Sequence, residues 1–198
     1  YWVDPSTGSA SFVNPIAGTA VTFDHCRFNH APLLNLKTHA DTLTMTDCFV
    51  GTFGYDPKNT VPLSHMENVF FDTGTVVLRR VCIDSSAYNS DPTEVYTTAL
   101  VVAQTNPSET TIYLTMDQVI VNGAMTQGDG TGLPYPIFLS ARYAAGKDVH
   151  LNISGCAIQK GQIGYISVEE LLGGQVTIVD GGGNYDLDTG ALLDLSYP

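Results

Sequence analysis

Apolar and polar residues alternate along this chain in a pattern that recurs six times. Each copy has two apolar residues separated by one position, a two-residue interruption, and two small or apolar residues again separated by one position. Alternation of this kind is typical of a β-strand with one buried face, and the interruption predicts a sharp bend between two strands. The copies are Val21-Phe23-Cys26-Phe28, Leu43-Met45-Cys48-Val50, Val76-Leu78-Val81-Ile83, Leu114-Met116-Val119-Val121, Leu151-Ile153-Cys156-Ile158 and Val176-Ile178-Gly181-Gly183.

The bends between the two strands of each copy contain Asp or Gly in most repeats. Both residue types tolerate the left-handed conformation that such a corner requires. The bend pairs are Asp24-His25, Thr46-Asp47, Arg79-Arg80, Asp117-Gln118, Ser154-Gly155 and Val179-Asp180. A third apolar run follows each copy, at 33–36, 63–71, 95–102, 137–143, 165–168 and 191–195, so each repeat is predicted to hold three short strands.

Three strands per repeat, stacked repeat on repeat, predict an all-β chain folded as a parallel β-helix. Crossovers between parallel strands are right-handed in nearly all proteins. We therefore expect a right-handed parallel β-helix, a solenoid of about six to seven coils. The copies begin at 21, 43, 76, 114, 151 and 176, so their spacings are 22, 33, 38, 37 and 25. An antiparallel β-sandwich also has many short strands, but it does not require one motif six times.

Length and composition predict a single folded domain over residues 1–198. Hydrophobic residues make up 43% of the chain and charged residues 14%, which supports a packed core. No apolar run reaches the length of a membrane span, so no membrane insertion is expected. Trp2-Val3 and Phe12-Val13 resemble strands of an earlier coil, and 192–195 resembles a strand of a later one. Because bare solenoid ends need covering, we expect a fragment of a longer chain or partner subunits at the ends.

The net charge of −12 makes nucleic acid a poor partner, because phosphate binding requires Lys and Arg. Cys26, Cys48 and Cys156 fall at one inward position of their repeats and are predicted to be buried thiols, whereas Cys82 should face outward. A bond between Cys26 and Cys48 is the alternative, because adjacent coils lie within disulfide reach. No Cys or His pair has zinc-site spacing, so neither a metal nor another cofactor is expected.

The candidate ligand-binding residues lie in three insertions, at 51–60, 84–94 and 122–135. Equivalent corners of a solenoid stack above one another, so these loops should share one flank, which is commonly the binding face. Their rings can stack on sugars and their carboxylates and amides can bind hydroxyl groups. The alternative is that the rings only anchor the loops. The candidates are Tyr55, Asp56, Tyr88, Asn89, Asp129 and Tyr135.

A catalytic site is a second possibility, since glycoside hydrolysis needs two carboxyl groups at about 5 Å or at about 6.5–9.5 Å. Adjacent coils are about 4.8 Å apart, so acids on neighbouring coils can meet this requirement. Asp84 and Asn122 occupy equivalent corners, and Asp24, Asp47 and Asp117 are predicted to share a bend column interrupted by Arg79-Arg80. Such acids more often only form the bend. The catalytic candidates are Asp84, Asp91, Glu94 and Asp117.

The motif copies at 21–28, 43–50 and 151–158 resemble coils of the pectate-lyase-like superfamily, and nearly the whole chain follows this pattern. Irregular coil lengths and Tyr- and Thr-rich loops make it most similar to the β-helix of a bacteriophage tailspike or tail fibre. The resemblance implies a homotrimer, assembled with other virion components, that is located in the virion tail or outside the cell and binds cell-surface polysaccharide. The alternatives are an endo-acting polysaccharide hydrolase or lyase and a bacterial surface adhesin passenger.

Overall fold

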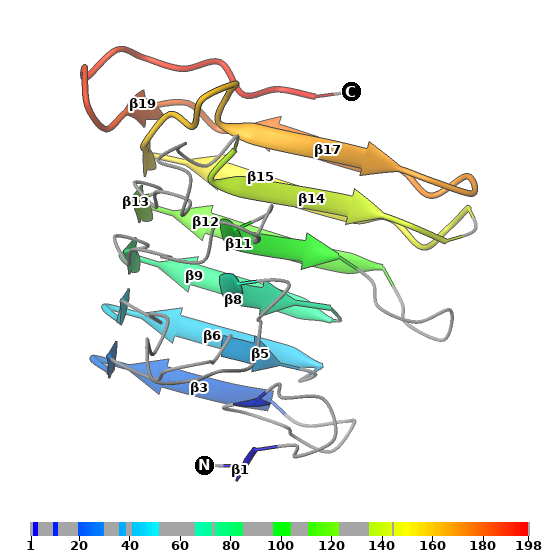
Figure 1. Cartoon of the computed structure of the whole chain (residues 1–198), viewed down its shortest axis with the longest axis horizontal. Helices are drawn as coiled ribbons and strands as arrows, with labels where there is room; N and C mark the ends of the chain where they lie inside the picture. The colour runs from blue at the N-terminus through cyan, green and yellow to red at the C-terminus, as the bar shows by residue number, and fades with distance from the viewer. Residues whose placement is uncertain are drawn as a thin grey trace, which may run out of the picture.

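The chain folds as a parallel β-helix whose coils stack in chain order (Figure 1). The structure is a computed structural model, and it describes residues 2–3, 10–11, 20–29, 36–38, 41–51, 66–72, 74–84, 97–103, 111–122, 135–143 and 145–197. No helix occurs among these residues, and none of them therefore belongs to a helix able to span a membrane. The all-β prediction is confirmed.

Three parallel sheets form the walls of the solenoid, and successive strands of one sheet are three strands apart in the chain. The long sheet contains β3 (Ala20–Asp24), β6 (Thr42–Thr46), β9 (Thr75–Arg79), β12 (Ile112–Asp117), β15 (Val149–Ser154) and β18 (Val176–Asp180). The short sheet contains β4 (Arg27–Asn29), β7 (Phe49–Gly51), β10 (Cys82–Asp84), β13 (Ile120–Asn122), β16 (Ala157–Ile158) and β19 (Tyr185–Asp186). The five-stranded sheet contains β5 (Leu36–Thr38), β8 (Met66–Phe71), β11 (Thr97–Ala103), β14 (Ile137–Ala141) and β17 (Ile166–Glu170).

The register of the sheets confirms the motif for the first five copies. The first apolar residue of each copy pairs with its counterpart in the next coil, in the order Val21, Leu43, Val76, Leu114 and Leu151. From the second copy to the fifth, all four motif residues are buried in one continuous core. The apolar alternation therefore sets which face of each strand is inside, because side chains alternate across a strand.

All four cysteines are free thiols. Cys48 and Cys156 are buried in the core, and Cys26 packs against it. Cys82 is half-buried and pairs with Phe49 and Ile120 in the short sheet. The predicted inward and outward placements are confirmed, and the alternative of a disulfide between Cys26 and Cys48 is wrong.

The sixth copy differs from its prediction. Leu151 pairs with Ile178 and not with Val176, so the coil spacing is 27 residues and not 25. The bend of this coil contains one extra residue, so that Tyr185 pairs with Ala157 and Asp186 with Ile158. The predicted places of Gly181 and Gly183 in the motif are therefore wrong, because a run of three glycines has no side chains to mark the register.

Residues 187–197, here called the closing segment, turn back across the last coil (Figure 1). Antiparallel bridges join Tyr185 to Leu192 and Ile178 to Tyr197. The predicted parallel strand at 191–195 is therefore wrong. The segment binds polar residues that replace the apolar core of the earlier coils: the Leu195 amide donates to Asp180 Oδ2 (2.8 Å) and the Thr189 amide to Asp186 Oδ1 (2.6 Å).

At the N-terminal end, β1 (Trp2–Val3) and β2 (Ala10–Ser11) pair antiparallel with each other. The prediction that Trp2-Val3 forms a strand of an earlier parallel coil is therefore wrong. The other predicted strand at this end, Phe12-Val13, lies outside the described residues. That the native protein extends beyond this chain stays a prediction.

Candidate functional site

A ladder of left-handed residues joins the long sheet to the short sheet. The second residue of each of the first five bend pairs has a positive φ, with 53° at His25, 52° at Asp47, 51° at Arg80, 55° at Gln118 and 60° at Gly155. Each of their amides donates to a carbonyl of the next coil, as His25 does to Thr46 (3.0 Å). Residues 24–25, 46–47, 79–80, 117–118 and 154–155 are called the bend ladder below. The ladder presents two columns of side chains outside the core.

The columns correct one sequence prediction. Asp24 and Asp117 belong to the column that ends the long-sheet strands, together with Arg79. Asp47 belongs instead to the left-handed column, with His25 and Arg80. The predicted single column of Asp24, Asp47 and Asp117 is therefore wrong by one position, because the second coil has Thr46 where the first and fourth coils have Asp24 and Asp117.

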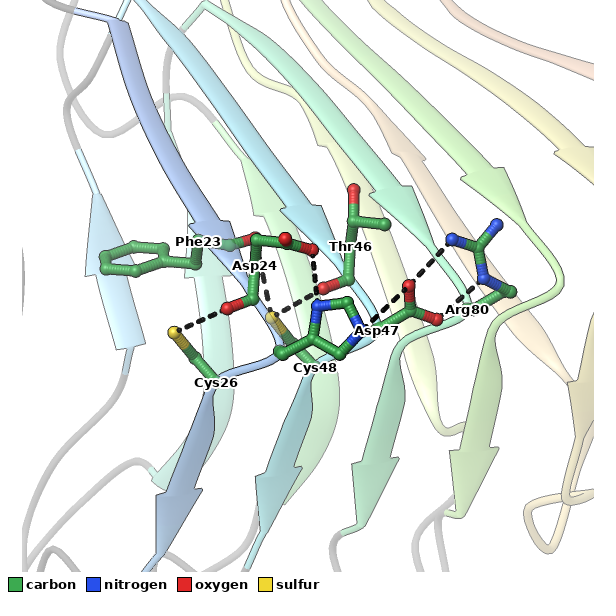
Figure 2. Close-up of polar contacts among 8 residues, drawn as sticks. Phe23, Asp24, Cys26, Thr46, Asp47, Cys48 and Arg80 are labelled. Atoms are coloured by element: carbon green, nitrogen blue, oxygen red, sulfur yellow. Dashed lines mark hydrogen bonds and ion pairs between the residues drawn. The ribbon is translucent and has the colours of Figure 1, made fainter.

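The first three coils bring four charged or ionisable side chains of the ladder into contact (Figure 2). The Arg80 guanidinium donates from Nε to Asp47 Oδ1 (2.7 Å) and from Nη2 to Asp47 Oδ2 (2.8 Å). His25 lies between two carboxylates, with Nδ1 at 2.9 Å from Asp24 Oδ1 and Nε2 at 3.9 Å from Asp47 Oδ2. The hydrogen bonds from Arg80 lower the pKa of Asp47. Asp47 is therefore held ionised and is unsuited to donate a proton.

Among the described residues, Asp24, His25 and Asp47 come closest to forming a metal site. One ligand atom each from Asp24, His25 and Asp47 lie within 4.8 Å of one another. Imidazole and carboxylate donors suit transition-metal ions. Both oxygens of Asp47 are already bound by Arg80, however, so a cation would have to displace the guanidinium. The chemistry that the ladder does perform in this structure is ion pairing between coils.

The outward-facing side chains of the long sheet form a hydroxyl-rich surface beside the ladder. Strand residues alternate between buried and solvent-facing positions, and many of the solvent-facing ones are threonines. We call this surface the outer face. Its threonines are Thr22, Thr42, Thr44, Thr46, Thr75, Thr115 and Thr177.

Tyr113 and His150 add an aromatic pair to the outer face. They are register partners on β12 and β15, and their rings stack with centroids 5.1 Å apart and planes 18° apart. Because the two rings stack between neighbouring coils, their planes project outward from the sheet and lie roughly perpendicular to the solenoid axis. On its other side Tyr113 pairs with the short side chain of Thr75, and 50% of Tyr113 is exposed. One face of the tyrosine ring is therefore open above β9.

Of the candidate catalytic and ligand-binding residues, the structure describes three: Asp84, Asp117 and Tyr135. Asp84 and Asn122 are register partners, as predicted, and Asn122 Nδ2 donates to Asp84 Oδ1 (3.1 Å). Asp84 ends a short-sheet strand, whereas Asp117 precedes the start of the next one, so the short sheet separates these two acids. The candidates outside the described residues are Tyr55, Asp56, Tyr88, Asn89, Asp91, Glu94 and Asp129.

Tyr135 is half-buried and packs against the next coil. A Cβ atom added to Gly164 would lie 2.9 Å from Tyr135 Cε1, so the ring occupies the space that a side chain would need. This contact favours the anchoring interpretation of Tyr135 over ligand binding.

Sequence reasoning did not select Tyr113 and His150. The signal that could have found them is their place in the motif: each comes one residue before the first apolar position of its copy. Aligning the fourth and fifth copies puts the two rings in one outward column.

Comparison with family models, curated proteins and solved structures finds no match to this chain. The fold assignment therefore depends on strand register. Any function has to be inferred from the surfaces described above, because a fold by itself does not specify an activity.

Proposed function

We propose that this chain is the β-helical part of a bacteriophage tailspike or tail fibre that attaches a virion to polysaccharide on the host surface. The observation that carries the proposal is the half-exposed ring of Tyr113, stacked on His150 within the threonine-rich outer face. The parallel β-helix and the resemblance of three motif copies to pectate-lyase-like coils support membership of that superfamily.

The outer face has the chemistry that sugar recognition requires. The apolar face of a pyranose packs on an aromatic ring, and its hydroxyl groups hydrogen-bond to hydroxyl and amide side chains. Thr75, Thr115 and the exposed Asn152 supply such groups around Tyr113. All of them project from strands held by parallel pairing on both sides, so little ordering is needed on binding.

Attachment is favoured over cleavage by the placement of the described acids. Asp84 binds Asn122, Asp47 is held ionised by Arg80, and the short sheet separates Asp84 from Asp117. A glycosidase needs one carboxyl group that keeps its proton near neutral pH. An endo-acting hydrolase or lyase remains the alternative function, with a site on the loops at 51–60, 84–94 and 122–135. Release of new reducing or unsaturated ends from a bound polysaccharide would support the alternative.

The test is binding of the full chain to a microarray of bacterial surface polysaccharides. We expect Tyr113→Ala to weaken binding about tenfold, equivalent to about 1.4 kcal/mol, because the stacking surface is lost. Tyr185→Ala is the matched control, since Tyr185 is 38% exposed but lies on the short sheet.

Deletion of residues 84–94 locates the site independently. If that deletion abolishes binding in a folded protein while Tyr113→Ala has no effect, the ligand is bound by the loops and not by the outer face. If the unmodified chain binds no polysaccharide, the attachment function itself is wrong.

A further inference from the structure

We propose that the glycan bound on the outer face carries a carboxylate group, which Arg79 binds while Tyr113 stacks on a neighbouring neutral sugar. This inference rests on the proposed attachment function and specifies its ligand. It also assigns the direction of the glycan, which lies along β9 and across the solenoid axis.

Arg79 differs from the other arginines whose side chains are described. Arg80 binds Asp47, Arg142 binds Glu169, and Arg27 lies over the Phe49 ring at 4.3 Å. Arg79 is exposed at the end of β9, and within the described part of the chain its guanidinium makes no hydrogen bond or ion pair. A guanidinium presents its donors in a planar fork that matches a carboxylate. Arg79 is therefore available to bind an acidic ligand.

The open face of Tyr113 and the Arg79 guanidinium lie at the two ends of one row. Thr75 is the register partner of Tyr113, and the outward side chains that follow it on β9 are Val77 and Arg79. Four residues of strand span about 13 Å, a length that a short oligosaccharide covers. Along this row Thr75 offers a hydroxyl, Val77 a small apolar surface and Arg79 a cation. A glycan stacked on Tyr113 therefore reaches Arg79 by following the strand.

The charge of the whole molecule restricts which acidic glycan fits. The chain carries a net charge of −12, and Asp117 is the register partner of Arg79. These charges repel a polymer that is anionic at every sugar. Charges further than about 8 Å away are largely screened at physiological salt, so most of the net charge does not oppose a single carboxylate bound to Arg79. We therefore infer a repeat unit in which acidic sugars are separated by neutral ones.

The experiment uses bacterial capsular polysaccharides printed as pairs, each in its native form and with its uronic acids reduced to neutral sugars. The full chain, Arg79→Gln and Lys160→Gln are compared on the same array. Lys160→Gln removes the same charge from an exposed side chain outside the outer face, at the corner that follows β16. We expect the unmodified chain to prefer native acidic polysaccharides at least tenfold over their reduced forms. Arg79→Gln should lose this preference, and Lys160→Gln should keep it.

The outcomes distinguish failure of the carboxylate assignment from failure of the proposed attachment function. Binding of neutral or reduced glycans that depends on Tyr113 but not on Arg79 overturns the carboxylate assignment and leaves attachment intact. Acidic binding that Arg79→Gln leaves unchanged also overturns it. Absence of binding to every printed polysaccharide overturns both proposals. Thermal melts of the variants check folding. Arg79→Gln should melt at the same temperature as the unmodified chain, because the Arg79 side chain makes no hydrogen bond or ion pair within the described residues.

Discussion

At the residue scale, the bend ladder shows that position in the solenoid outweighs local preference. A left-handed conformation costs an ordinary L-residue roughly 1–2 kcal/mol, and glycine avoids most of this cost. Yet His25, Asp47, Arg80 and Gln118 all adopt it, and Gly155 is the one glycine at this position within the bend ladder. The conformation persists because each amide binds the next coil, and because the charged members pair across coils.

Gln118→Gly should therefore stabilise the protein. Gln118 is exposed, and the amide bond to Ser154 O (3.0 Å) is kept by glycine, so the strain of the positive φ is removed without loss of that hydrogen bond. We expect the free energy of unfolding to rise by about 0.5–1 kcal/mol, measured by chemical denaturation. Gln175→Gly is the control, since Gln175 is also exposed but has no positive φ, and it should give no gain. Equal effects at both positions would contradict the strain argument.

At the element scale, the last coil ends the solenoid by exchanging apolar for polar inward residues. Asp180 and Asp186 stand where Ile153 and Ile158 stand one coil earlier. Asp186 accepts hydrogen bonds from the Tyr165 hydroxyl (2.7 Å) and from the Thr189 amide and hydroxyl. Bonds from Tyr165 and Thr189 lower the pKa of Asp186 to about 2, and the bond to Asp186 raises the pKa of Tyr165 to about 12. The closing segment is therefore tied to the last coil by buried polar contacts.

This pair predicts a pH dependence with two limits. The lowered pKa of Asp186 means that its stabilisation is present above its ordinary value of 3.8 and is lost as the pH falls toward 2. The raised pKa of Tyr165 means that its stabilisation is present below its ordinary value of 10.0 and is lost as the pH rises toward 12. Tyr165→Phe should lower the free energy of unfolding by about 1 kcal/mol at neutral pH. It should also reduce the loss of stability that the unmodified chain shows at low and at high pH.

Denaturation of the unmodified chain and of Tyr165→Phe across the pH range measures this effect. Tyr143→Phe is the matched control, because it removes the same hydroxyl from another half-buried tyrosine. A pH profile that Tyr165→Phe leaves unaltered would contradict a stabilising role for the Tyr165–Asp186 bond.

At the scale of the whole molecule, the solenoid is a continuous apolar core with an acidic exterior. The core runs without interruption from the second coil to the fifth, and its first and last coils are less completely buried. Among the described residues, several large exposed apolar side chains lie after β16, in the connections on either side of β17 and in the closing segment, among them Ile163, Leu172 and Leu192. Apolar surface of this kind commonly marks an association surface.

We expect a homotrimer in solution, as the proposed attachment role requires. Light scattering on the intact protein should give three times the chain mass, which is 21.2 kDa for these residues. A trimer would extend the search for the binding site to grooves between chains. A monomer would contradict the tailspike proposal and favour an adhesin passenger or a secreted polysaccharide enzyme, with the site confined to one chain.

The sequence by itself determined the strands, the two-residue bends and the inward columns of the first five coils, because apolar alternation is a local signal that burial imposes on each strand. The tertiary structure alone decided which residues meet across coils, such as Arg80 with Asp47 and Tyr113 with His150. Partners in a parallel β-helix are a whole coil apart, and insertions of unequal length hide that distance in the sequence. The shift of the sixth copy is hidden in the sequence because glycines 181–183 carry no side-chain pattern. The reversal of the closing segment is hidden because its polar partners lie on β18 and β19, outside the segment itself.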